Sequence, residues 1–394
     1  MDSEFRLLQK ISNSLKTNKV VLICTCASAW QNEFVAGIVD GMSMIDLSDP
    51  IVREQAIRQP DAFVEKIKKR TALYNLEYAL DVLPCLSAAD VPDGTFVAVV
   101  NQSYNLKPIV EGLDNVVLLE LPLQPADKEP FLPSRSLFVQ SVEYGSGNLH
   151  EKILDGKLSA DKFSDVEDRD KFYAGYLKNF LRRIVKDLTT VSDDMKFHRF
   201  LCAVASSTSR MVNYANLGNA ADISSPTAKQ WLAFLEGTGV VYLLDAVEHS
   251  SMKRVAKAPK VYFADTGLVA YLLRINNVDE LNESAFFEAI FENFVVNAIR
   301  DSYIANGFDV NLSYFRDSNA KEIDLLLHYN NVIYPIDIRR GTFETGKMCK
   351  KFRIIKSAEQ DGVTKIGVGC VIGLGKRLEP MADDLWYVPV GSLG

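Results

Sequence analysis

The segment Val20-Val-Leu-Ile-Cys-Thr-Cys-Ala-Ser-Ala-Trp-Gln31 decides how the first part of the chain folds. Its five leading residues are apolar and predict a buried strand from Val20 to Cys24. The residues that follow predict a short helix from Gln31 to Val39. A strand, a short loop and a helix are the repeating unit of a parallel α/β sheet, so we expect that fold here.

The same pattern continues outward from this segment. Further strands are predicted at 43–47, 96–100 and 116–121, with an amphipathic stretch at 63–70. This spacing indicates a parallel sheet flanked by helices. Residues 122–135 carry four prolines, and we expect them to leave the sheet as a linker.

The middle of the chain changes to helical patterns. The pattern of residues 136–194 predicts highly charged helices, and a compact unit is expected to follow from Phe197 to about Ala264. Its helix from Thr227 to Glu236 has apolar residues at helical spacing, with Ser225-Pro226 predicted as the N-cap and first helical position. Two strands, at 240–244 and 260–263, come next, with a basic loop between them. Three helices and a hairpin predict a winged helix.

The last part returns to an α/β pattern. A long helix is expected from Phe286 to Tyr303, then strands near Tyr314 and at 323–327 and 332–338, a helix around 349–358, and a strand at 366–372. The predicted domains are therefore 1–135 with the parallel sheet, 136–275 with the helical and winged-helix region, and 276–394 with the second α/β unit.

Composition narrows the class of protein. The chain is 47% hydrophobic and 24% charged, which is typical of a globular protein. No apolar run approaches the roughly 20 residues needed to cross a bilayer, and the first residues lack the apolar stretch of a signal peptide. We therefore expect a cytoplasmic protein without membrane contact. The six scattered cysteines lack metal-ligand spacing and are expected to be core thiols.

Several segments resemble a known family. They are Asp49-Pro50 through Arg53, Ala56 and Pro60-Asp-Ala-Phe63, then Leu119-Glu-Leu-Pro-Leu123, Lys257-Ala-Pro-Lys-Val-Tyr-Phe-Ala-Asp-Thr-Gly-Leu268, Phe291-Glu-Asn-Phe-Val295, Glu322-Ile-Asp324 and Tyr334-Pro-Ile-Asp-Ile338. On these the chain resembles a bacterial and archaeal family of AAA-type ATPases. The resemblance implies a P-loop domain, a winged helix and a C-terminal domain of the restriction-endonuclease-like type.

The phosphate-binding loop departs from that family. A Walker A loop has the pattern G-x-x-x-x-G-K-[ST], in which the lysine reaches the phosphates and the hydroxyl binds magnesium. Here Cys24 and Ala29 stand at the glycine positions, Trp30 at the lysine and Gln31 at the hydroxyl. We therefore expect no ATP hydrolysis and regard ATP as an improbable ligand.

Two other parts of the ATPase site are also changed. The region Leu73-Tyr-Asn-Leu-Glu77-Tyr-Ala-Leu-Asp81 lacks an Asp-Glu pair at the end of an apolar strand, so Glu77 or Asp81 is at most a remnant of the Walker B acid. The Gly-Arg that the family carries before the last strand is Gly112-Leu113 here. These three changes together predict a degenerate ATPase domain without a nucleotide cofactor.

The C-terminal part offers an acidic constellation. Restriction-endonuclease-like sites use two strand acids to hold a metal, a lysine two residues after the second acid, and often a helix glutamate. The matching residues here are Glu292, Asp324 and Asp337, with Arg339 in the place of the lysine. Asp324 and Asp337 are the candidate ligands for Mg²⁺ or Mn²⁺, on two strands joined by a turn at Asn330-Asn331.

The arginine leaves two interpretations open. Arginine stays protonated and binds oxygen as a planar fork, so it can stabilise a phosphate but cannot release a proton. In the first interpretation Asp337 and Arg339 pair with Glu292 and Asp324 in a charge-balanced relic or a pure binding site. In the second, the four residues form a metal-dependent nuclease with weakened activity.

Basic residues suggest a partner. Between Lys196 and Lys260 there are eight Lys/Arg and four Asp/Glu, a local net charge of +4 in a chain of net charge −7. Candidate phosphate contacts are Lys229 on the expected recognition helix and Lys253, Arg254 and Lys257 in the wing-like loop. The wing could instead contact another domain, or be a solvated loop. A second basic run, from Arg339 to Lys356, borders the acidic constellation.

Three functions follow from these observations. The first is a non-hydrolysing homologue of an AAA-type ATPase that acts as a nucleic-acid-binding or protein-interaction module, with a protein partner or a homo-oligomer as alternatives to nucleic acid. The second is a divalent-metal nuclease that uses the C-terminal acids. The third is an ATP-binding protein with a non-standard nucleotide site.

Overall fold

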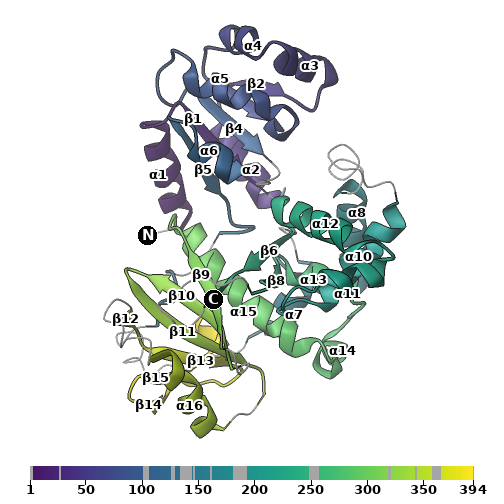
Figure 1. The fold of residues 1–394 in the computed structure, drawn as a ribbon, viewed down its shortest axis with the longest axis vertical. Helices are drawn as coiled ribbons and strands as arrows, with labels where there is room; N and C mark the ends of the chain where they lie inside the picture. Colours follow the sequence, from purple (N-terminus) through teal and green to yellow (C-terminus); the bar gives the residue numbers. More distant parts are fainter. Residues whose placement is uncertain are drawn as a thin grey trace.

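The computed structural model describes residues 3–25, 28–100, 106–125, 129–133, 144, 147–159, 162–180, 193–247, 257–317, 321–341, 344–356 and 365–393. Figure 1 shows a parallel sheet at one end of the molecule, a second sheet at the other end, and a group of helices beside them. The α/β fold class is therefore confirmed, with one parallel sheet and one mixed sheet. None of the described helices is long and apolar enough to span a membrane.

The N-terminal sheet is parallel throughout, in the order β2-β3-β4-β1-β5. Its strands are β1 (Val20–Cys24), β2 (Ser43–Asp46), β3 (Thr71–Tyr74), β4 (Phe96–Val100) and β5 (Val116–Glu120). Four of them were predicted, and β3 is an addition. In an open parallel sheet, ligands bind outside the carboxyl ends of the strands. The loop after β1 lies at that edge.

Helices cover both faces of this sheet. Because side chains alternate along a strand, Val21 and Ile23 of β1 pack with α1 (Ser3–Leu15) and α2 (Ala29–Ile38). Val20 and Leu22 face the other way, into a second cluster. That cluster contains α3 (Pro50–Arg58), α4 (Pro60–Lys66), η1 (Leu76–Val82), α5 (Leu83–Ala88) and α6 (Leu106–Glu111).

The middle region has the expected helices and hairpin. It contains α7 (Leu149–Asp155), α8 (Val166–Phe180), α10 (Asp194–Ser206), α11 (Tyr214–Ala221), α12 (Ser225–Gly237), β6 (Val241–Leu244), β7 (Ala246–Val247), β8 (Lys260–Phe263), α13 (Thr266–Leu272) and α14 (Val278–Glu283). Strands β6 and β8 pair antiparallel. The N-cap of α12 is Ser224 rather than Ser225, because the Ser224 hydroxyl accepts from the Thr227 amide at 3.2 Å. The winged-helix assignment stays a prediction.

The C-terminal sheet has the order β14-β15-β13-β11-β10-β9-β7, with β12 beside β11. Its further elements are α15 (Phe287–Ala305), β9 (Asn311–Arg316), β10 (Glu322–Tyr329), β11 (Val332–Arg339), α16 (Thr345–Lys356), β12 (Lys365–Ile366), β13 (Gly369–Gly373), β14 (Glu379–Ala382), β15 (Leu385–Pro389) and η5 (Val390–Ser392). Asn330 and Asn331 both have positive φ and form the predicted turn between β10 and β11. The predicted strand 366–372 is in fact two strands.

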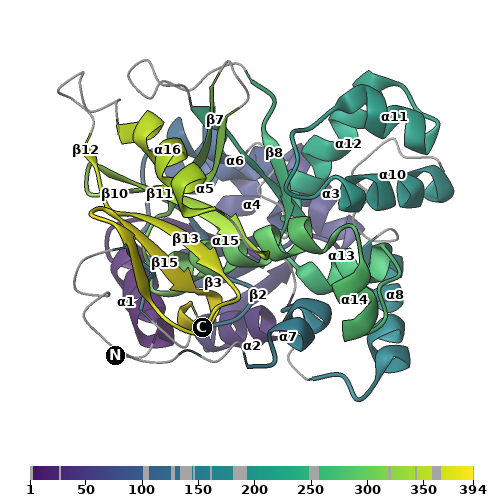
Figure 2. The same cartoon turned by 90° about the horizontal axis from the view of Figure 1, so that it is seen from below.

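Helix α15 connects the parts of the molecule. In Figures 1 and 2 it lies between the C-terminal sheet and helices α13 and α14. Arg300 of α15 forms an ion pair with Glu120 of β5 at 3.2 Å, which joins it to the N-terminal sheet. Strand β7 pairs with β9, and one hydrophobic cluster runs from Leu123 to Leu393. The core is thus continuous across the predicted boundary at 275/276, and both domain boundaries stay predictions.

Candidate functional site

The loop after β1 leads into α2, whose first backbone amides are capped by the chain's own side chains. Ser28 is the N-cap of α2, and its hydroxyl accepts from the Gln31 amide at 3.1 Å while the Gln31 side chain accepts from the Ser28 amide at 3.1 Å. This reciprocal pair is a capping box. It gives hydrogen-bond partners to two of the backbone N–H groups that have none within the helix at its N-terminus. Both residues are buried. Cys26 and Ala27 of this loop lie outside the described residues.

The same two side chains tie the helix to the end of β5. The Ser28 hydroxyl donates to the carbonyl of Leu123 at 2.8 Å. The Gln31 amide group donates to the carbonyls of Leu121 and Pro122 at 3.1 and 3.0 Å. The position that carries a magnesium-binding hydroxyl in a Walker A loop therefore has a structural role in this chain.

Trp30, at the lysine position, is directed toward α1. Its indole nitrogen donates to Glu4 at 2.8 Å, and its ring stacks on Phe34 with centroids 4.8 Å apart. Cys24, at the first glycine position, is half-buried at the end of β1. None of the described side chains of this loop carries a positive charge toward the place of a phosphate.

The residues compared with the Walker B acid and the family's arginine lie after β3 and after α6. Asn75, directly after β3, has φ +56° and donates to Asp46 at 2.7 Å. Glu77 and Asp81 both lie on the short helix η1, and Asp81 is exposed. Leu113 follows α6, where the family carries arginine. We find no acid and arginine pair among these described positions that would complete a nucleotide site.

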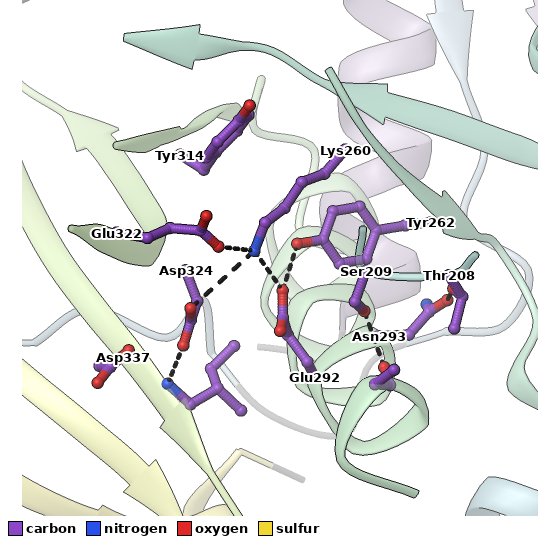
Figure 3. A network of polar contacts seen from close by, with 12 residues as sticks. Thr208, Ser209, Lys260, Tyr262, Glu292, Asn293, Tyr314, Glu322, Asp324 and Asp337 are labelled. Atoms are coloured by element: carbon purple, nitrogen blue, oxygen red, sulfur yellow. Dashed lines mark hydrogen bonds and ion pairs between the residues drawn. The ribbon is translucent and has the colours of Figure 1, made fainter. Parts of the chain in front are cut away.

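The C-terminal acids, in contrast, converge. Glu292 comes from α15, Asp324 from β10 and Asp337 from β11. Figure 3 shows Glu292 and Asp324 directed toward the ammonium group of Lys260, a residue of β8 that is 3% exposed, with Asp337 drawn beyond Asp324. Lys260 Nζ lies 2.9 Å from Glu292, 2.6 Å from Glu322 and 4.0 Å from Asp324. Lys260 is therefore the centre of this network.

Asp324 and Asp337 form a buried pair on neighbouring strands. The amide of Ile338 donates to Asp324 at 2.8 Å. Arg339 Nη2 lies 3.1 Å from Asp337 and 3.9 Å from Asp324, as expected of two residues that alternate onto the same face of β11. Lys351 of α16 also donates to Asp337, at 2.6 Å. Asp337 is fully buried, and no donor group among the described residues reaches its second oxygen.

These contacts shift the pKa values of the acids in opposite directions. Burial, the Asp324 charge and a hydrogen bond with Asp324 raise the pKa of Asp337 to about 8. Burial alone would raise the pKa of Asp324 too, but the hydrogen bond with Asp337 and the Lys260 charge bring it below its usual range. Of this coupled pair, Asp337 is thus the carboxyl that keeps its proton more readily, and Asp324 is the one that stays ionised.

Two more groups are shifted around Lys260. Burial raises the pKa of Glu292 to about 7, although Lys260 and the Tyr262 hydroxyl, which donates to Glu292 at 2.6 Å, act against this. Burial opposes the charge of Lys260, but the three carboxylates raise the pKa of its ammonium group above its usual value. Lys260 is therefore a permanent cation inside the cluster.

Sequence reasoning missed Lys260, Glu322 and Lys351 as members of this cluster. A signal was present for Lys260: a lysine and a tyrosine alternate with apolar residues in a buried strand, within the most distinctive matching segment. A lysine in such a strand needs an acidic partner. No local pattern marks Lys351, because it reaches Asp337 from a helix that follows later in the chain.

The structure also bears on a metal ion, which the resemblance implies. Among the residues it describes, no group of three or more His, Cys, Asp or Glu side chains is placed to hold one. The four acids Glu292, Glu322, Asp324 and Asp337 face the four cations Lys260, Arg316, Arg339 and Lys351. The acids therefore do not fit a divalent metal, because the chain's own cations already hold them.

The candidate nucleic-acid residues are only partly described. Lys229 is exposed on α12. Lys257 is half-buried, and its ammonium group donates to the carbonyl of Arg316 at 2.5 Å. Lys253 and Arg254 lie outside the described residues. On α16, Lys350 and Arg353 are exposed, whereas Lys356 forms an ion pair with Asp384.

Comparisons with known proteins give relatives without an assigned activity. Residues 159–279 match the family "Domain of unknown function (DUF8612)", and residues 287–393 match "Domain of unknown function (DUF4143)". The chain is 27% identical over 227 residues to the uncharacterised proteins Rv2008c of Mycobacterium tuberculosis and Mb2031c of Mycobacterium bovis, which covers 58% of this chain and 49% of each relative. The chain thus spans about half the length of these curated relatives.

One solved structure is similar in part. It is the Walker-type ATPase PABY2304 of Pyrococcus abyssi, with a TM-score of 0.38 and 11% sequence identity, over 69% of this chain and 95% of that one.

Proposed function

We propose that this chain is a non-hydrolysing homologue of an AAA-type ATPase that acts as a nucleic-acid-binding or protein-interaction module. The observation that carries the proposal is the closed start of α2, where Ser28 and Gln31 bind each other and the end of β5. A phosphate at a helix start needs free amide donors and a nearby cation. Here the cap uses donors for the chain itself, and Trp30 binds Glu4.

The lost cation matters as much as the closed cap. A P-loop lysine contacts the β- and γ-phosphates directly, and the magnesium ion is bound by the adjacent hydroxyl. Gln31 instead binds the carbonyls of Leu121 and Pro122, so replacing it also breaks the connection to β5. This supports a domain that keeps its sheet as a scaffold and takes no nucleotide. It also weighs against the third function, a non-standard ATP site at this loop.

The partner half of the proposal rests on charge. Lys229 is exposed on α12 in a region with a local net charge of +4, and exposed lysines bind phosphates without sequence preference. Lys257 is a weaker candidate because it already binds the Arg316 carbonyl. The alternative function, a nuclease at the C-terminal acidic site, is less favoured because four cations of the chain already bind its acids. A cytoplasmic location and a soluble partner belong to the same proposal.

Two measurements test the proposal. In the first, ATP or ADP with Mg²⁺ is added at millimolar concentration, and the melting temperature and phosphate release are followed. We expect no change, whereas a ligand at about 100 times its Kd stabilises a protein by about 2.7 kcal/mol. A reproducible rise in melting temperature, or phosphate release that the Gln31→Ala variant loses, would overturn the non-hydrolysing half.

The second measurement is a filter-binding titration with single-stranded and double-stranded DNA and RNA at low salt. We expect salt-dependent binding without sequence preference. Absence of binding to all of these would leave the protein-interaction half as the function. Plasmid cleavage with Mg²⁺ or Mn²⁺ that Asp337→Ala abolishes would replace the proposal with the nuclease.

A further inference from the structure

The ammonium group of Lys260 is surrounded by oxygen atoms of the kind that bind divalent metals. Three carboxylates, from Glu292 on α15 and from Glu322 and Asp324 on β10, converge on it (Figure 3). Carboxylate oxygens are the preferred ligands of Mg²⁺, Mn²⁺ and Ca²⁺. Lys260 Nζ, with three N–H donors, has an oxygen from each of these acids around it.

The lysine is fixed in this position by the fold. Lys260 lies on β8, which pairs with β6, and its aliphatic chain leads the ammonium group over the ring of Tyr314 at 5.4 Å. Two residues along the strand, Tyr262 donates to the same Glu292 oxygen at 2.6 Å. The backbone of β8 is held against α15 close to Lys260, because Asn293 binds both backbone groups of Phe263.

The other acid of the expected metal site is held separately. Asp337 binds Lys351 and Arg339 on the side away from Lys260, at 2.6 and 3.1 Å. A divalent cation placed among these acids would stand next to Lys260 and close to two more positive groups. The repulsion between like charges at such distances in a buried site is large. Lys260 thus binds one group of acids, and Arg339 and Lys351 bind Asp337.

We propose that Lys260 is the resident cation of this acidic site, in the place where a divalent metal would otherwise bind, and that it joins strand β8 to α15 and β10. The wild-type site then excludes divalent metals, since no three of the described acids are placed to hold one while Lys260 is present. Without the lysine side chain, Glu292, Glu322 and Asp324 can close in around a divalent cation. This inference concerns the C-terminal site alone and does not depend on the proposed loss of nucleotide binding.

The test is a titration of the full chain with Mn²⁺. Calorimetry measures the heat of binding, and electron paramagnetic resonance measures the concentration of the free ion. We expect no saturable binding to the wild type, and none to Lys351→Ala, which removes a lysine from the neighbouring Asp337 without clearing the space beside Glu322. Lys260→Ala should bind one Mn²⁺ with a Kd at or below about 1 mM. Adding Glu322→Gln to that variant should weaken binding by about tenfold or more.

Two results would overturn the inference. One is stoichiometric Mn²⁺ binding by the wild type that Asp324→Asn abolishes. The other is a folded Lys260→Ala protein that binds no Mn²⁺ at about 10 mM, well above the weakest protein sites. If Lys260→Ala is unfolded without metal, recovery of its circular dichroism on addition of Mn²⁺ supports the inference. If neither Lys260→Ala nor Lys260→Ser recovers its circular dichroism with Mn²⁺, the inference is contradicted.

Discussion

Ser28 and Gln31 bind each other at the start of α2, and each also binds the chain at the end of β5. This relationship places a buried glutamine where a P-loop protein has its magnesium-binding hydroxyl. The side chain is 0% exposed and makes three hydrogen bonds in addition to its backbone bond to Ser28. The start of α2 is therefore a structural connection between this helix and the end of β5.

Replacing Gln31 with alanine should destabilise the protein. The change leaves the carbonyls of Leu121 and Pro122 and the Ser28 amide without their partner, and each unsatisfied buried group costs about 1–3 kcal/mol. We expect a loss of roughly 3 kcal/mol in the free energy of unfolding, measured by urea denaturation. Gln55→Ala, at an exposed position of α3, is the control and should change little. Equal stability of the two variants would contradict the capping role.

Asn293 should be equally important at the centre of the molecule. Its side chain accepts from Thr208 at 2.5 Å and from the Phe263 amide at 2.9 Å, and donates to the Phe263 carbonyl at 2.8 Å. Asn293→Ala removes all three bonds in a buried place, so we expect a loss of about 3 kcal/mol in chemical denaturation. Asn219→Ala, on the exposed side of α11, should change it by less than about 0.5 kcal/mol. A similar small change for Asn293→Ala would count against the bond network.

These bonds join two distant segments that carry the family resemblance. The segment from Lys257 to Leu268 contains β8, and the segment from Phe291 to Val295 contains its partners on α15. Lys260 and Tyr262 bind Glu292, and Phe263 binds Asn293. The two segments therefore hold each other in place.

The features that could be predicted from the sequence are those set by residues close together in the chain. The strand from Val20 to Cys24 follows from a local apolar run, and the alignment of Asp337 with Arg339 follows from alternation along one strand. The Ser28 to Gln31 capping box was also readable, because its spacing is a known helix signal.

The cations of the acidic site could not be predicted in the same way. Lys260 reaches Glu322 from a strand far earlier in the chain, and Lys351 reaches Asp337 from a helix beyond the sheet. Which of the many lysines faces a given acid is decided by the packing of β8 and α16 on the sheet. The pairing of β7 with β9 is of the same kind, since both strands are short or ambiguous in sequence.

Nucleic-acid affinity should respond differently to two lysines. Lys229 is exposed on α12, so Lys229→Ala should weaken binding to all sequences alike and reduce the slope of log K against log salt by about 1. Lys257→Ala is the matched control, because its ammonium group is occupied by the Arg316 carbonyl and should leave the slope unchanged. Filter binding at several salt concentrations measures both. A larger effect of Lys257→Ala would place the contact on the wing instead.

The pH dependence of stability should report the proton that Asp337 keeps beside Asp324. Burial and Asp324 raise the pKa of Asp337 to about 8, far above the ordinary value of an aspartate. Between these two values the folded protein holds a proton that the unfolded chain has lost, so the free energy of unfolding falls as the pH rises through this range. Above the raised pKa no further loss from Asp337 is expected.

Asp337→Asn removes this titration while it keeps the shape of the protonated acid. We expect the wild type to lose more stability than the variant between about pH 5 and pH 8, so that the variant gains relative to the wild type as the pH rises. Glu292, whose pKa burial raises to about 7, contributes a loss of the same sign in both proteins and largely cancels in the comparison. Urea denaturation at both pH values measures the difference. Asp40→Asn, at an exposed position, should run parallel to the wild type, and a parallel course for Asp337→Asn as well would show that Asp337 is ionised throughout.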